Sequence, residues 1–167
     1  MSSFVYDYNL RGVGLAPGIY GDLSLASQTF ISPAAGADFT ITVPDTGGVW
    51  EIVALRAQLV TSATVANRGV VVQVKDHAAN IVYESPASLA ITASLTIGVT
   101  FSAQYPSGVG DITTTKKVGL ALPDGPYLPG WTVGTSTALI DTADQWSLIR
   151  AWYRQLQTVS NEGLNGG

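Results

Sequence analysis

The sequence predicts an all-β protein, a two-sheet antiparallel β-sandwich that is jelly-roll-like and carries an extended N-terminal arm. Apolar residues alternate with small or hydroxyl-bearing ones through most of the chain, as in strands whose side chains point to opposite faces. Gly, Pro and Asp clusters separate these segments at the spacing of a sandwich, and they divide the chain into about eight strands. Helical periodicity is almost absent, although hydrophobic residues make up 46% of the 167 positions. We therefore expect the core to form between two sheets of a single domain.

The predicted arm comprises residues 1–36. Phe4, Tyr6 and Tyr8 alternate there, and Gly and Pro residues then interrupt any regular element. Because the three aromatic side chains share one parity, they would dock as one row on a sheet of their own subunit or of a neighbour. Both interpretations stay open, and the second makes these three residues and Arg11 candidate interface residues.

The predicted sandwich domain comprises residues 37–157, and residues 158–167 form a C-terminal tail that we expect to be flexible. Turn signals separate its strands, including a hairpin loop at 76–79 and a proline-rich loop at 123–130. The short Gly-x-Gly runs at 12–14 and 108–110 are also interpreted as turns. The strand candidates that alternate or are continuously apolar are residues 38–43, 49–62, 69–75, 80–84, 89–101, 111–122 and 131–139.

The last element, residues 144–156, fits two structures. In a strand, one face would carry Trp146, Leu148, Arg150 and Trp152. In a helix, one stripe would carry Trp146, Ile149, Tyr153 and Leu156. The strand is favoured, because aromatic residues suit sheets and the preceding elements are all strands.

The most regular strand candidate is residues 89–101. Its apolar parity should line the core, and its other parity is small and rich in hydroxyl groups. Neither parity carries a charge, whereas a solvated strand face normally carries Lys, Glu or Arg. The second face is therefore predicted to contact another sheet or another subunit, with Thr92, Ser94 and Thr96 as contact residues.

Charge is scarce in this chain and limits the partners that it would bind. Charged residues make up 12% of the sequence, which fits either a compact neutral domain or a subunit covered by partners. The net charge is −4, and the only adjacent basic pair is Lys116 and Lys117, so we expect no nucleic-acid partner. Residues 85–110 carry no charge, but their alternating hydroxyl residues favour a strand, and we expect no membrane partner. The N-terminus lacks the pattern of a signal peptide.

Residues suited to catalysis are few, and we expect a protein that is not an enzyme. His77 is the only histidine and there is no cysteine, so we expect no catalytic triad, no metal and no cofactor. Most aspartates fall at predicted turns, where the carboxylate caps the backbone, and a catalytic carboxylate pair is disfavoured. A calcium site at Asp141 and Asp144 is a weaker alternative. The four tryptophans are predicted to be core residues rather than a sugar-stacking platform.

Three motifs occur within residues 48–156: SATVANR at 62–68, LPGW at 128–131 and DQW at 144–146. This pattern resembles small structural proteins of tailed bacteriophages. The resemblance implies a jelly-roll-like virion protein at the capsid surface, made in the host cytoplasm. It also implies a cement or decoration subunit, often a homotrimer, whose partner is the major capsid protein. The resemblance supplies no catalytic residues.

Two classes of function follow. A structural virion subunit would bind through β surfaces and the arm, and its polar anchors would be Arg56, Arg68, Arg150 and Arg154, although each would equally suit an ordinary surface ion pair. The alternative is a carbohydrate- or receptor-binding β-sandwich module of a phage fibre or tail, which requires two or more exposed tryptophans in a shallow groove. A carboxylate hydrolase is a remote third hypothesis.

Overall fold

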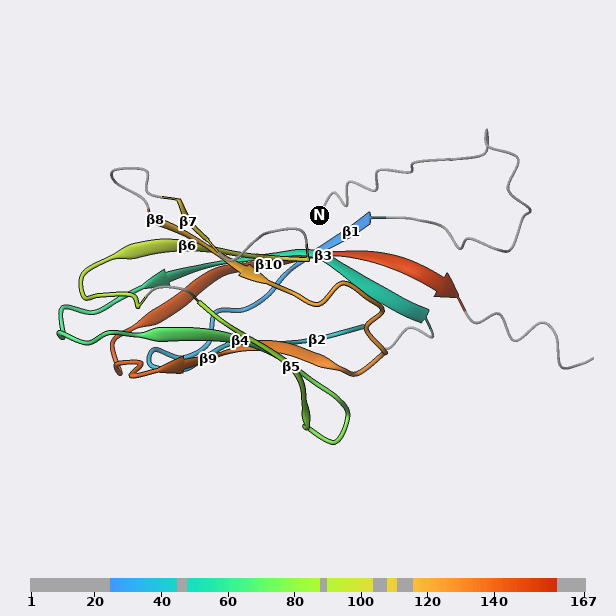
Figure 1. The fold of residues 1–167 in the computed structure, drawn as a ribbon, viewed down its shortest axis with the longest axis horizontal. Coiled ribbons are helices and arrows are strands. Elements are labelled where there is room, and N and C mark those ends of the chain that lie inside the picture. The colour runs from blue at the N-terminus through green and yellow to red at the C-terminus, as the bar shows by residue number, and fades with distance from the viewer. Residues whose placement is uncertain (1–24, 45–47, 88–89, 104–107, 111–115, 159–167) are drawn as a thin grey trace, which may run out of the picture.

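The computed structural model describes residues 25–44, 48–87, 90–103, 108–110 and 116–158, and these residues form two β-sheets packed face to face (Figure 1). They contain no helix, and therefore no helix that would span a membrane. The prediction of an all-β, two-sheet sandwich is confirmed. Phe4, Tyr6, Tyr8 and Arg11 lie outside the described residues, as does the tail from residue 159 onward.

The larger sheet has six strands and runs along the upper side of Figure 1. All its pairings are antiparallel except that of β6 with β8, which is parallel and departs from the antiparallel prediction. In spatial order the strands are β1 (Leu25–Thr29), β10 (Gln145–Thr158), β3 (Gly48–Val60), β6 (Thr96–Ser102), β8 (Lys116–Ala121) and β7 (Gly108–Gly110).

The smaller sheet has four strands, all antiparallel. In spatial order they are β2 (Thr40–Thr42), β9 (Thr132–Ala138), β4 (Gly69–Lys75) and β5 (Ile81–Pro86). The predicted hairpin at 76–79 joins β4 to β5, and the Asp76 carboxylate accepts backbone hydrogen bonds from Ala78 and Asn80, both at 2.9 Å. This is the turn chemistry expected of an aspartate at that position.

The core lies between the sheets and follows the alternation of the sequence. Every second residue of β4 and β6 is buried, among them Val72, Val99 and Phe101. Phe39 packs edge-on against Phe101 and Trp146, with ring centroids 6.1 and 5.2 Å apart. Tryptophan burial agrees with the prediction for Trp50 and Trp146, which are 9% and 0% exposed.

Residues 144–156 form a strand, as favoured, but the predicted shared face is wrong. A register shift lies between Ser147 and Arg150, and Leu148 has a φ of 50° within it. The extra residue of such a bulge reverses the parity of the strand. Trp146 therefore points into the core, while Arg150 and Trp152 lie on the outer side of the sheet.

The predicted strand 89–101 is too long, because β6 begins only at Thr96. The Thr61 hydroxyl donates to the Thr92 carbonyl and accepts from the Leu95 N–H, both at 2.9 Å. Ser94 has a φ of 56°, which is incompatible with an extended strand. Side-chain hydrogen bonds of Thr61 thus add to backbone bonds such as that from the Thr61 N–H to the Leu95 carbonyl at 2.8 Å, and together they hold a loop in place of a regular strand. Two smaller corrections are that residues 108–110 form the strand β7 rather than a turn, and that β1 lies within the predicted arm.

Candidate protein-interaction surface

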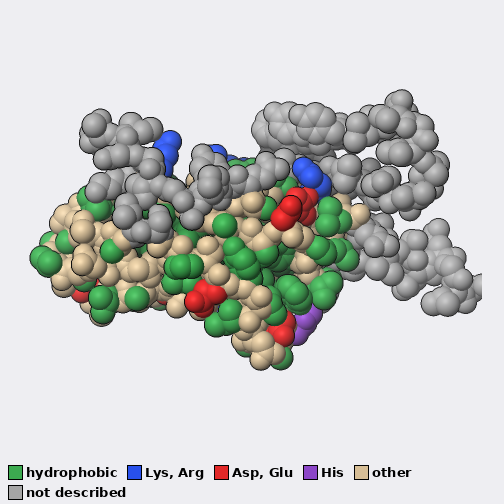
Figure 2. Space-filling view, in the orientation of Figure 1, with side chains coloured by type: hydrophobic (Ala, Val, Ile, Leu, Met, Phe, Trp, Pro, Cys, Tyr) green, Lys and Arg blue, Asp and Glu red, His purple; other side chains and the backbone are tan. Residues whose placement is uncertain are grey.

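The outer side of the six-stranded sheet gathers most of the described cations. We call this surface the arginine face, and it consists of Arg56 on β3, Lys117 on β8, and Arg150, Trp152 and Arg154 on β10. These residues alternate with buried ones such as Val118, Ala151 and Tyr153, which fixes their outward direction. Figure 2 shows blue Lys and Arg side chains along the upper margin of the molecule, on the side of this sheet.

At the centre of the arginine face, two guanidinium groups lie against one indole. The Cζ atoms of Arg56 and Arg150 are 5.6 and 5.3 Å from the centroid of the Trp152 ring. This is within the range of a cation–π attraction. Arg150 also donates to the Ser27 hydroxyl on β1 at 3.0 Å, and both arginines are exposed. The cluster is therefore held in place within the sheet and remains open to a partner.

Arg154 has a different environment on the same face. It donates to the Glu51 carboxylate at 3.1 Å, and the two side chains are 43% and 24% exposed. Exposed pairs of this kind contribute little to stability, roughly 0–1 kcal/mol. Of the predicted polar anchors, Arg56 and Arg150 thus lie together with exposed guanidinium groups, whereas Arg154 already holds a carboxylate.

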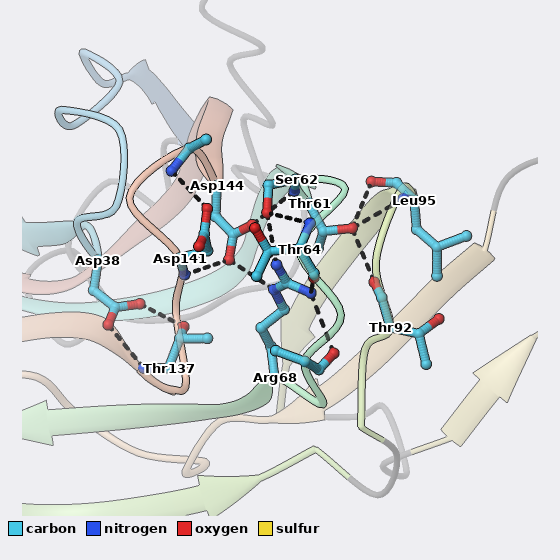
Figure 3. A network of polar contacts seen from close by, with 12 residues as sticks. Asp38, Thr61, Ser62, Thr64, Arg68, Thr92, Leu95, Thr137, Asp141 and Asp144 are labelled. Atoms are coloured by element: carbon cyan, nitrogen blue, oxygen red, sulfur yellow. Dashed lines mark hydrogen bonds and ion pairs between the residues drawn. The ribbon is translucent and has the colours of Figure 1, made fainter.

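Arg68 is not an interface residue, because it is completely buried in an ion pair with Asp144 (Figure 3). Two parallel contacts join the groups, Nε to Oδ2 at 2.7 Å and Nη2 to Oδ1 at 3.0 Å. The remaining donors of Arg68 reach the carbonyls of Thr64 and Ala66 and the hydroxyl of Ser62. This arginine is fully satisfied inside the protein.

The Asp144 carboxylate also has all its hydrogen-bond partners within the protein. It accepts backbone N–H groups of Ser62 at 2.7 Å and Asp141 at 2.8 Å in addition to Arg68. Burial acts to raise the pKa of Asp144, but these hydrogen bonds outweigh it and hold the pKa below its ordinary value. Both carboxylate oxygens of Asp144, one of the two residues of the predicted calcium site, are therefore occupied by protein donors. No group of three metal-binding side chains occurs among the described residues.

The other aspartates of the described segments act mainly as caps. Asp38 accepts the backbone N–H of Thr137 at 2.8 Å as well as the hydroxyls of Thr135 and Thr137, and Asp141 accepts the N–H of Ala143 at 3.0 Å. These contacts agree with the interpretation of turn-associated aspartates as backbone caps. His77 is exposed in its hairpin, where its ring lies against Gly130 of the LPGW turn.

Of the three predicted contact residues of the hydroxyl parity, only Thr96 lies in β6, on the same outer side of the sheet as Arg56. Thr92 and Ser94 belong to the loop that packs on Thr61 and Ser62, and the Ser94 N–H donates to the Ser62 carbonyl at 2.8 Å. Thr96 opens β6 opposite Val60. All three are exposed in the single chain, and they do not form the continuous strand face that was predicted to contact another sheet or subunit.

Sequence reasoning did not identify the cluster itself. Arg56 and Arg150 were separate candidates, and Trp152 was assigned to the core. The pairing register that places Arg56 opposite Arg150 depends on the bulge at Leu148. A sequence signal did exist, since Arg150 and Trp152 are two residues apart in one strand.

Comparison of the chain with protein-family models, curated proteins and solved structures finds no match.

Proposed function

We propose that this protein is a non-enzymatic subunit of a protein assembly, namely a capsid cement or decoration subunit of a tailed bacteriophage. The observation that carries the proposal is the exposure of β1. Ala26 and Gln28 pair with Tyr153 and Ala151, whose side chains point into the core, yet Ala26 and Gln28 are themselves exposed. The inward side of β1 is thus left uncovered.

An uncovered strand of this kind favours a partner. Among the described strands, β1 is the edge of its sheet, and its sequence LASQT has neither a charge nor a proline. Soluble proteins usually protect an open edge with Lys, Pro or a bulge, because an unpaired edge invites another chain. We infer that a partner protein covers the exposed inward side of β1 when the assembly forms.

The resemblance to phage structural proteins supports the virion setting. Two of its three motifs are joined by the buried ion pair, because Arg68 is the last residue of SATVANR and Asp144 is the first residue of DQW. The third, LPGW, forms a tight turn in which the Trp131 N–H donates to the Leu128 carbonyl and Gly130 has a φ of 78°. These motifs build the scaffold, so the binding function is assigned to the surfaces that they leave exposed.

The carbohydrate-binding alternative has less support. It needs several exposed indoles in one groove, but Trp50 and Trp146 are buried. The ring of Trp152 is in contact with two guanidinium groups, which compete with a stacked sugar.

The test is co-sedimentation of the purified protein with capsids of its source phage that lack it, together with the subunit mass from light scattering. We expect binding to capsids, and Gln28→Lys to weaken it at least tenfold, about 1.4 kcal/mol. Ser136→Lys, on the exposed outer side of β9, is the matched control and should bind normally. A wild-type protein that stays in the supernatant would refute the proposal.

A further inference from the structure

The pairing of β3 with β10 places two like charges directly opposite one another. Arg56 and Arg150 are register partners, and both guanidinium groups lie against Trp152. The ion pairs among the described residues are Arg68 with Asp144 and Arg154 with Glu51, so neither arginine of the cluster has a carboxylate partner there. Within the described part of the chain, the cluster has two cations and an aromatic surface but no anion.

This arrangement costs the isolated subunit stability. Like charges directly opposite in a sheet repel, whereas an opposite pair at the same positions would attract. The ring of Trp152 and the Ser27 hydroxyl position the arginines without neutralising them. Each exposed guanidinium group is a planar fork of N–H donors that suits a planar anion such as a carboxylate.

We propose that Arg56 and Arg150 bind the carboxylate of an Asp or Glu side chain in an acidic segment of a partner protein, with Trp152 as the apolar surface beside it. The inference rests on the proposed function in taking a protein as the partner. Tryptophan and arginine are also the residues that most often dominate protein interfaces.

A carboxylate of a protein partner fits this surface better than a nucleic acid or an anionic membrane does. Arg154 on the same face already pairs with a carboxylate, which is an internal example of the contact. The chain as a whole carries a net charge of −4, so long-range repulsion opposes a densely charged nucleic acid or anionic membrane more strongly than a protein segment that offers a few carboxylates. Next to Arg56, the outer side of β6 has the small residues Gly98 and Thr100, and an added Cβ at Gly98 would meet no atom within 4 Å. A peptide backbone can therefore approach this part of the sheet closely.

The inference is tested by titrating the full chain with an oligo-glutamate peptide, with the arginine Nε–Hε signals followed by NMR. We expect saturable shifts at Arg56 and Arg150, and at least a fivefold loss of affinity in Arg56→Gln and in Arg150→Gln. Lys75→Gln, on β4 of the other sheet, is the matched control and should bind like the wild type. Equal binding by the two arginine variants, or no binding by the wild type, would overturn the inference.

Two further measurements separate the alternatives. A single-stranded oligonucleotide or a phosphatidylserine vesicle that binds through the same arginines more tightly than the peptide would overturn the choice of a protein carboxylate. Arg56→Glu should keep its fold, because it creates an opposite-charge pair, and should lose the peptide. A wild type that binds the peptide but not capsids would refute only the proposed function, whereas capsid binding with no peptide binding would refute only this inference.

Discussion

The two arginine sites of this sandwich, one at Arg68 and one at Arg56 and Arg150, differ in burial and in hydrogen-bond partners. At Arg68, a buried guanidinium group donates to Asp144, to Ser62 and to loop carbonyls, and both members of the ion pair are 0% exposed. At Arg56 and Arg150, two exposed guanidinium groups lie against Trp152 without a carboxylate partner among the described residues. The same side chain thus stabilises the fold in one place and remains available for binding in the other. The difference is set by burial and strand register, not by residue type.

The largest expected effect comes from breaking the buried site. Asp144→Asn leaves the charge of Arg68 buried without its counter-ion, and we expect a loss of about 3–5 kcal/mol in the free energy of unfolding. Urea denaturation measures it. Glu51→Gln breaks the exposed pair with Arg154 and should cost no more than about 1 kcal/mol. Equal losses in the two variants would contradict the distinction between the sites.

Acid should weaken the buried site selectively. The pKa of Asp144 in the folded protein lies below the ordinary aspartate value of 3.8. A carboxyl group with a depressed folded-state pKa contributes stability above its unfolded pKa and loses that contribution as the pH falls through the folded value. The free energy of unfolding should therefore decline below about pH 4, and more steeply in the wild type than in Asp144→Asn. If the free energy of unfolding fell equally steeply with pH in both proteins, Asp144 would not be the group responsible for the acid-induced loss of stability.

Most of the strands other than β1 and β7 could be predicted from the sequence, because alternation of apolar and polar residues shows which side of a sheet is buried. It placed β4 at its observed bounds and identified residues 144–156 as a strand. Alternation fails where tertiary contacts change the local backbone. The bulge at Leu148 reverses the parity of β10, and the Thr61 hydroxyl ends the ladder before Thr96.

The candidate site depended on those same tertiary contacts. Arg68 and Arg56 look alike in the sequence, and only the fold brings Asp144, 76 positions further along the chain, against Arg68. The parallel pairing of β6 with β8, which brings Lys117 opposite Gly98, is likewise a long-range event. Composition predicted a surface poor in charge, but it held no information on where the few cations gather.

A smaller effect should follow from removing the indole that holds the two arginines. Trp152→Leu keeps an apolar side chain on the outer side of β10 but removes two cation–π contacts, which are worth about 0.5–1 kcal/mol each at exposed sites. Thermal unfolding of this variant, of Arg56→Gln and of the double variant forms a mutant cycle. Strict additivity would show that Arg56 and Trp152 do not interact.

The smallest expected effect is a gain in the free energy of unfolding, whereas the preceding substitutions are expected to lower it. Arg56→Glu replaces a like-charge cross-strand pair with an opposite one, so we expect the free energy of unfolding to rise by about 0.2–1 kcal/mol. The gain should shrink at high salt, because both groups are exposed and screened. Urea denaturation at low and high salt measures both effects. Arg56→Gln removes the repulsion and the contact with Trp152 without adding an attractive pair, so it should be less stable than Arg56→Glu. A stabilised variant that no longer binds a carboxylate would show that the two arginines are kept together for a partner at the expense of the fold. A destabilised Arg56→Glu would instead show that the contact of Arg56 with Trp152 stabilises the fold. Both arginine sites would then contribute to stability, and they would differ only in how much.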